Sequence, residues 1–173
     1  RPDGRRTTYV TDHQPGLDVL ERLLARNHNA AIKLAPAAKW PTVWNRSAEF
    51  EWISRDGQVR QLVAWFGNLS RQSGQRVATI LDHCGNVLDS VAGPHEPCDP
   101  AQGEIGLWLY EPDAAVIAAR LVGALAKSLE LRQPTPEIAY LTGDTFIETC
   151  AVSAFEVIEI LPFDMKQIGR AHV

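Results

Sequence analysis

Two strand-like runs on either side of an Asp-Gly pair constrain the fold more than any other feature. Residues 49–54 alternate between polar and apolar side chains, and a largely apolar run over 59–66 follows Asp56-Gly57 as the return strand. Alternation with a period of two is typical of a β-strand. Asp and Gly both tolerate the positive φ angles that a two-residue hairpin turn requires. The sequence therefore predicts an antiparallel hairpin over 49–66.

A helix followed at once by a short apolar run precedes this hairpin. Leu17, Leu20 and Leu24 recur on one face of a helix that begins near Gly16. The apolar run over 30–35 comes directly after it, which is typical of a buried parallel strand. A helix leading into such a strand is the repeating unit of a doubly wound α/β sheet.

Further elements follow a polar segment over 68–75. A second hairpin is predicted over 76–91, and strands are predicted over 106–110, 138–141 and 155–161. Apolar residues recur at every fourth position at Ile117, Leu121, Leu125 and Leu129, which predicts one helix with Asp113 as its N-cap.

The charge of the chain is divided unevenly along its length. Residues 1–81 hold twelve Lys/Arg against seven Asp/Glu, a balance of +5, whereas residues 82–173 hold five against fourteen, a balance of −9. A split of this size suggests two functional units. With the polar segment near residue 72, it predicts one domain over 1–72 and a second over 73–173.

Composition narrows the cellular setting. The 173 residues are 45% hydrophobic and 22% charged, which is typical of a soluble globular protein. No apolar run is long enough to cross a bilayer, and no signal peptide opens the chain. The three widely spaced cysteines favour reduced thiols and a cytoplasmic location. Because the chain begins at Arg1 and its one methionine is Met165, we expect it to be part of a longer protein.

Seven short strings occur in an order that resembles the C-terminal portion of bacterial class I S-adenosylmethionine-dependent methyltransferases with a THUMP-like domain. They are residues 2–6 (PDGRR), 32–36 (IKLAP), 49–54 (EFEWIS), 65–67 (WFG), 109–113 (LYEPD), 139–142 (AYLT) and 161–164 (LPFD). The resemblance implies an α/β fold, α+β overall: the end of a Rossmann-like methyltransferase sheet, then a small THUMP-like α/β domain truncated at its C-terminus.

This resemblance also implies an activity and a cofactor. The parent protein would transfer a methyl group from S-adenosylmethionine, with RNA as the expected substrate. The glycine-rich loop that holds the cofactor would lie upstream, and Arg1 would be the last residue of an Asp-Pro-x-Arg-Arg box. No Gly-x-Gly-x-Gly occurs in residues 1–173. We therefore expect this chain alone to bind no cofactor and to be inactive.

Two groups of residues are candidates for substrate binding. Lys33 and Pro36 lie at the carboxyl end of the predicted strand, where open α/β sheets place their ligands. The alternative is that Lys33 only extends from the sheet edge into solvent. Arg1, Arg5 and Arg6 are candidates for phosphate contacts, and the alternative is a solvated terminal loop.

Four arginines, Arg55, Arg60, Arg71 and Arg76, are candidates for an RNA-binding patch on the hairpin and the polar segment. Arginines that keep a sheet face soluble are the alternative. His83-Cys84 and the 95–98 run His-Glu-Pro-Cys lack the spacing of a zinc site, so no metal is expected. No nucleophile–base pair identifies catalytic residues.

A second class of function stays open at this stage. The chain could be a non-catalytic module that binds RNA or a protein partner. A methyltransferase sheet without its first strands would leave the 30–34 strand with an exposed edge, which predicts pairing with a second copy of the chain.

Overall fold

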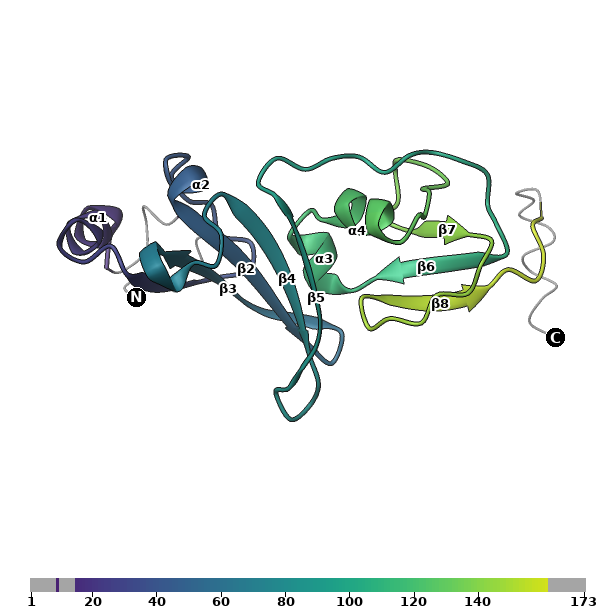
Figure 1. Cartoon of the computed structure of the whole chain (residues 1–173), viewed down its shortest axis with the longest axis horizontal. Coiled ribbons are helices and arrows are strands. Elements are labelled where there is room, and N and C mark those ends of the chain that lie inside the picture. Colours follow the sequence, from purple (N-terminus) through teal and green to yellow (C-terminus); the bar gives the residue numbers. More distant parts are fainter. Residues whose placement is uncertain (1–8, 10–14, 162–173) are drawn as a thin grey trace, which may run out of the picture.

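The computed structural model describes residue 9 and residues 15–161, which form two β-sheets with short helices (Figure 1). The five-stranded sheet has the order β1-β3-β2-β4-β5, and the three-stranded sheet has the order β7-β6-β8. The strands of the two sheets are β1 (Ala30–Leu34), β2 (Ala48–Arg55), β3 (Gln58–Phe66), β4 (Gln75–Leu81), β5 (Val87–Pro94), β6 (Trp108–Pro112), β7 (Leu141–Gly143) and β8 (Val152–Glu156). The helices are α1 (Leu17–Arg26), α2 (Trp44–Ser47), the 3-10 turn η2 (Gly67–Leu69), α3 (Ala114–Ala118) and α4 (Val122–Ser128). None of the helices in this part of the chain is long and apolar enough to span a bilayer.

The predicted first hairpin is confirmed. Strands β2 and β3 pair antiparallel, with Phe50 opposite Ala64 and Arg55 opposite Gln58. Asp56 and Gly57 form the turn with φ angles of 54° and 69°, the positive values expected for this dipeptide. The register shifts by one residue at Arg60, so a β-bulge lies beside the turn.

The predicted parallel pairing of the 30–35 run is wrong. Within the described residues β1 pairs only with β3, and it pairs antiparallel, with Ala30 opposite Phe66 and Leu34 opposite Leu62. The physical reason is that β3 returns between β1 and β2. The strands β1 and β2 therefore run in the same direction, but each forms its hydrogen bonds with β3. Exposure alternates along β1 up to the buried Leu34, so the strand is not buried on both faces.

The five-stranded sheet continues across the polar segment at 68–75. Strand β4 pairs parallel with β2, with Trp52 opposite Ala78, and β5 pairs antiparallel with β4. The second hairpin is thus confirmed, and Gly85 in its turn has a φ of 90°. One sheet therefore contains strands from both sides of residue 72. The domain division at that position stays a prediction.

The predicted long helix is interrupted. Asp113 does cap its start, since its Oδ1 accepts a hydrogen bond of 2.8 Å from the backbone N–H of Ala115. The chain then breaks into α3 and α4 because Arg120 adopts a φ of 57°. As a result Leu121 is buried, whereas Ile117 of the predicted stripe is exposed.

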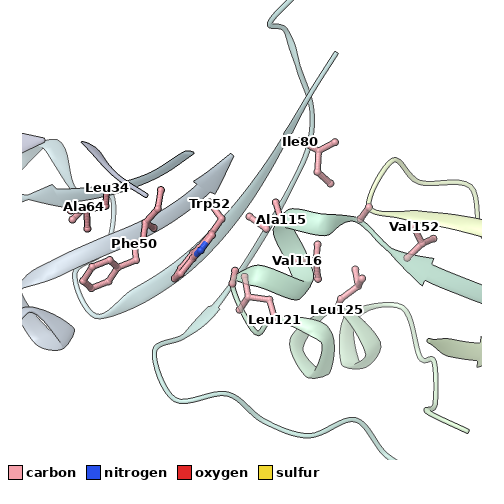
Figure 2. Packing of buried hydrophobic residues seen from close by; sticks show 14 of the residues in the cluster. Leu34, Phe50, Trp52, Ala64, Ile80, Ala115, Val116, Leu121, Leu125 and Val152 are labelled. Atoms are coloured by element: carbon pink, nitrogen blue, oxygen red, sulfur yellow. The ribbon is translucent and has the colours of Figure 1, made fainter. Parts of the chain in front are cut away.

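A continuous core joins the two sheets. Ala115 and Val116 of α3 are fully buried between Trp52 of the larger sheet and Val152 of the smaller one (Figure 2). Alternation along β2 directs Trp52 toward this helix and its neighbours Glu49 and Glu51 away from it. The fold is therefore a mixed α/β fold whose larger sheet contains both parallel and antiparallel pairs.

Two glycines with positive φ allow a matched test of the packing. Gly67→Ala is expected to lower the free energy of unfolding by about 3 kcal/mol, because its φ is 60° and an added Cβ would meet the carbonyl oxygen of His28 at 2.7 Å and the side chain of Asn29. Gly57→Ala shares the positive φ but has no atom within 4 Å of its Cβ, so a loss of about 1 kcal/mol is expected. Urea unfolding measures both values. Equal losses would contradict the close approach at Gly67.

Candidate functional site

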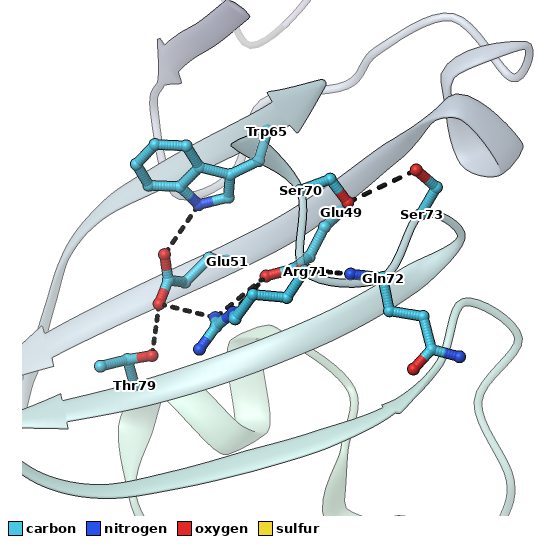
Figure 3. A network of polar contacts seen from close by, with 8 residues as sticks. All are labelled: Glu49, Glu51, Trp65, Ser70, Arg71, Gln72, Ser73 and Thr79. Carbon is cyan, nitrogen blue, oxygen red and sulfur yellow. Dashed lines mark hydrogen bonds and ion pairs between the residues drawn. The ribbon is translucent and has the colours of Figure 1, made fainter. Parts of the chain in front are cut away.

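Two glutamates lie almost entirely out of solvent on the face of β2 opposite the core. Glu49 is 1% exposed and Glu51 is 8% exposed. They are two residues apart on a strand, so their side chains point to the same face (Figure 3). Buried carboxylates cost free energy unless each oxygen has a partner.

Hydrogen bonds from three segments satisfy these carboxylates. Glu51 accepts from the indole Nε1 of Trp65 at 2.7 Å and from the hydroxyl Oγ1 of Thr79 at 2.5 Å. Glu49 accepts from Nε of Arg71 at 3.0 Å and from the backbone N–H of Gln72 at 2.8 Å. These six residues are called the carboxylate network: Glu49, Glu51, Trp65, Arg71, Gln72 and Thr79.

Arg71 bridges the two acids. Its Nη2 lies 2.9 Å from Oε1 of Glu49 and 3.2 Å from Oε1 of Glu51. Burial acts to lower the pKa of Arg71, but its hydrogen bonds and charge interactions with Glu49 and Glu51 outweigh this and raise the pKa. Since every carboxylate oxygen has a donor, the network is suited to holding the chain in place rather than to moving protons.

The segment that the network holds is the connection from β3 to β4. Arg71 and Gln72 belong to this connection, and Gly74 donates its backbone N–H to the carbonyl of Ala48 at 2.8 Å. The connection must cross the start of β2 for β4 to pair with β2 in parallel. The carboxylate network therefore fixes the path that brings the second hairpin into the sheet.

The structure separates the sequence-predicted substrate residues. Lys33 is exposed on β1 opposite Val63, which in turn lies opposite Glu51, so Lys33 shares the face of the carboxylate network. Pro36 is half-buried and its carbonyl accepts a hydrogen bond of 3.1 Å from the indole of Trp52. Arg1, Arg5 and Arg6 lie outside the described residues.

The four predicted RNA-binding arginines do not form one patch. Arg55 and Arg60 are exposed near the turn of the first hairpin. Arg71 is engaged by the carboxylate network, although its side chain is 61% exposed. Arg76 is 8% exposed and its guanidinium lies 5.7 Å from the ring centroid of Trp52. RNA contact by these residues stays a prediction.

The sequence analysis did not predict a groove of about 1050 Å³ at the start of β2. Its wall includes Asn45, Ser47, Ser73 and His95. Behind it lies an aromatic cluster, defined as Trp40, Phe50, Trp52 and His95: the rings of Trp40 and Phe50 stack at 4.1 Å, and His95 lies 6.3 Å from Trp40. The signal in the sequence is the concentration of aromatic residues around Pro41.

His95 has an unusual electrostatic setting. Burial and the positive charge of Arg76 lower its pKa below the ordinary value of 6.5, and Glu96 partly opposes this. Its Nδ1 is buried and makes no hydrogen bond within the described part of the chain. In residue 9 and residues 15–161, no three His, Cys, Asp or Glu side chains gather as a metal site would require.

Two proteins of Mycobacterium tuberculosis, from strains CDC 1551 / Oshkosh and H37Rv, are each 35% identical to this chain over 173 residues. Both are named uncharacterized S-adenosylmethionine-dependent methyltransferases. The alignments cover 98% of this chain and 46% of each relative. The chain therefore spans about half the length of the curated relatives it matches.

A solved structure shares the fold. The crystal structure of a "putative methyltransferase" from Porphyromonas gingivalis W83 superposes with a TM-score of 0.75 and 19% identity, over 94% of this chain and 44% of the other. No family model matches the chain. The mixed α/β architecture is thus one that also occurs in a protein described as a methyltransferase.

Arg71→Ala is expected to lower the free energy of unfolding by about 2 kcal/mol. Removing the bridge leaves Glu49 and Glu51 buried without a cation. The expected loss of unfolding free energy is smaller than for a fully buried ion pair because Arg71 is 61% exposed. The matched control is Arg60→Ala on the exposed bulge, which should change stability by less than about 0.5 kcal/mol. Chemical denaturation of both variants measures the difference, and similar losses would contradict the role of the network.

His95→Gln is expected to reduce the loss of stability on acidification. The folded protein favours neutral His95 because its pKa is below 6.5, whereas the unfolded chain takes up a proton near 6.5. Stability from this group is therefore complete above about pH 7 and falls as the pH drops toward the folded pKa, by at most about 1.4 kcal/mol per pH unit before solvent screening. Thermal unfolding between about pH 8 and pH 5 tests this. If the unfolding temperatures of the unaltered chain and of His95→Gln fall in parallel with pH, the prediction is wrong.

Proposed function

We propose that this chain is part of an S-adenosylmethionine-dependent methyltransferase and forms the closing region of its cofactor-binding sheet. The observation that carries the proposal is the 35% identity over 98% of the chain to relatives with this name. The elements α1 and the β2–β3 hairpin support it, because the class I resemblance implies a helix, a parallel strand and an antiparallel hairpin for the end of such a sheet. The strand β1 is present but pairs antiparallel within the described residues.

The two buried carboxylates do not fit the ribose of S-adenosylmethionine. A ribose would require a carboxylate with free oxygens, and the buried Glu49 and Glu51 have all of theirs engaged. A glycine-rich turn from a strand into a helix would be needed for close backbone approach, and the chain contains no Gly-x-Gly-x-Gly. We therefore propose that the cofactor-binding residues of the enzyme are not in this chain.

RNA is the substrate that we propose. Positive charge in the front half supports it, with Arg55 and Arg60 exposed near the hairpin turn and Lys33 exposed on β1. Methyl transfer from a sulfonium depends mostly on holding two reactants in line, so a substrate-binding surface beside the cofactor domain would contribute directly to rate.

A second candidate function is self-association as a binding module. Within the described residues β1 has a strand partner on one side only, and an unpaired strand edge favours pairing with another chain. Sedimentation at several concentrations tests this candidate, and a monomer throughout would contradict it.

Calorimetric titration with S-adenosylmethionine tests the main proposal. This chain alone is expected to show no binding up to about 1 mM, whereas the M. tuberculosis relative, which is about twice as long, is expected to bind at micromolar concentration. Micromolar binding by the chain alone would contradict the assignment of cofactor residues, and no binding by the relative would contradict the assignment of activity.

The same relative tests the substrate. With a methyl-labelled cofactor, we expect label to enter total RNA and not a protein fraction treated with ribonuclease. Label that enters protein or small molecules instead would leave the methyltransferase proposal standing and overturn its RNA part.

A further inference from the structure

The outer edge of β8 has no partner strand in the described part of the chain. Strand β8 is an end strand of the three-stranded sheet and pairs only with β6. The other end strand, β7, is covered, because Thr142 and Arg132 exchange two backbone hydrogen bonds of 2.7 Å and 3.0 Å. No described residue covers β8 in this way. An uncovered edge presents a row of unpaired N–H and C=O groups to another strand.

The hydrogen bonds to β6 show which backbone groups of β8 are left over. Val157, which follows β8 directly, donates its N–H to the carbonyl of Leu107 at 2.9 Å. Bonding to the neighbour alternates along an antiparallel strand, so the backbone groups of Phe155 also point toward β6. Those of Ala154 and Glu156 point away from the sheet, and no described residue hydrogen bonds to them. They are the groups that an added strand would use.

The sheet face beside this edge is apolar. Tyr110 is fully buried in the core, so its neighbour Leu109 on β6 points to the opposite face. Leu109 lies opposite Phe155, and Leu107 is bonded to Val157. Phe155 is 48% exposed and Leu107 is 61% exposed. These four residues are called the outer apolar face: Leu107, Leu109, Phe155 and Val157. A strand beside β8 would extend this face with apolar side chains of its own.

The surroundings of the edge are strongly acidic. Residues 82–161 hold thirteen Asp/Glu against three Lys/Arg, a balance of −10. Glu111 on β6, Glu156 on β8 and Glu159 are exposed, and none of them forms an ion pair within the described residues. Charge complementarity therefore favours a basic occupant and disfavours both an RNA backbone and a second copy of this acidic edge.

We propose that β8 binds an extended segment of a partner protein in which apolar residues alternate with Lys or Arg. The segment adds to the sheet as a fourth strand and pairs with the outward backbone groups of Ala154 and Glu156. Its apolar side chains lie beside Phe155 on the outer apolar face. Its basic side chains lie on the other face beside Glu156, because successive side chains of a strand point to opposite faces. The proposal does not rest on methyl transfer, since it involves neither the cofactor nor RNA.

Fluorescence anisotropy with a labelled peptide tests this surface. The probe is a peptide of about ten residues in which Val and Lys alternate, and its expected dissociation constant is on the order of 10 µM at low salt. The matched probe has the same composition with all Val residues first and all Lys residues last. It keeps the charge but not the alternation, so it should bind at least about tenfold more weakly.

Two variants of β8 test the edge and the face separately. Ala154→Pro removes an N–H that β6 does not use, which an edge strand tolerates, and should weaken peptide binding about tenfold. Phe155→Gln changes a half-exposed side chain of the outer apolar face and should weaken it about fivefold. The matched control is Leu23→Gln on α1, where Leu23 is 54% exposed and lies at the opposite end of the molecule (Figure 1). It should leave binding unchanged.

Glu156→Gln tests the charge of the edge. It should weaken peptide binding about threefold at low salt and by less at high salt. Glu21→Gln on α1, which also removes one exposed carboxylate, is the matched control and should have no effect.

Four results would overturn the proposal. The first two are equal binding of the alternating and the block peptide, and unaltered binding by both Ala154→Pro and Phe155→Gln. The third is a dimer of the unaltered chain in sedimentation that Ala154→Pro dissociates, which would assign the edge to a second copy. The fourth is binding of a single-stranded RNA decamer that Phe155→Gln weakens, which would assign the face to nucleic acid.

Discussion

The bridge from Arg71 to Glu49 and Glu51 is the interaction on which the rest of the sheet depends. Alternation along β2 sends Phe50 and Trp52 into the core and therefore forces both glutamates onto the opposite face. That face can be buried only if hydrogen-bond donors from other segments reach the two carboxylates. Arg71 lies in the connection that follows β3, so satisfying the acids and bringing β4 beside β2 are achieved by the same turn of chain.

Local sequence patterns predicted which segments form strands and helices better than they predicted which strands pair. The hairpin over β2 and β3 could be predicted because alternation and the Asp-Gly turn lie within one short segment. The partner of β1 could not, because an apolar run is the same whether it pairs parallel or antiparallel. The break at Arg120 also escaped prediction, since the fourth-position repeat continues through Leu121 although the backbone leaves the helical conformation at Arg120.

The candidate sites show the same limit. Which arginines face solvent depends on pairing: Arg76 lies opposite Phe50 and so points into the core, and Arg71 is drawn onto the glutamates. The sequence identified both as cations but could not separate them from Arg55 and Arg60. The sequence similarity to named methyltransferases supports the proposed activity, and the solved structure shows that the fold is shared.

Amide hydrogen exchange under native conditions measures whether one cooperative sheet spans both sides of residue 72. We expect the slowest amides of β2, β3 and β4, among them Trp52, Leu62 and Ala78, to share one opening free energy. Separate opening of β4 and β5, with β2 and β3 still protected, would contradict it and favour two independent units.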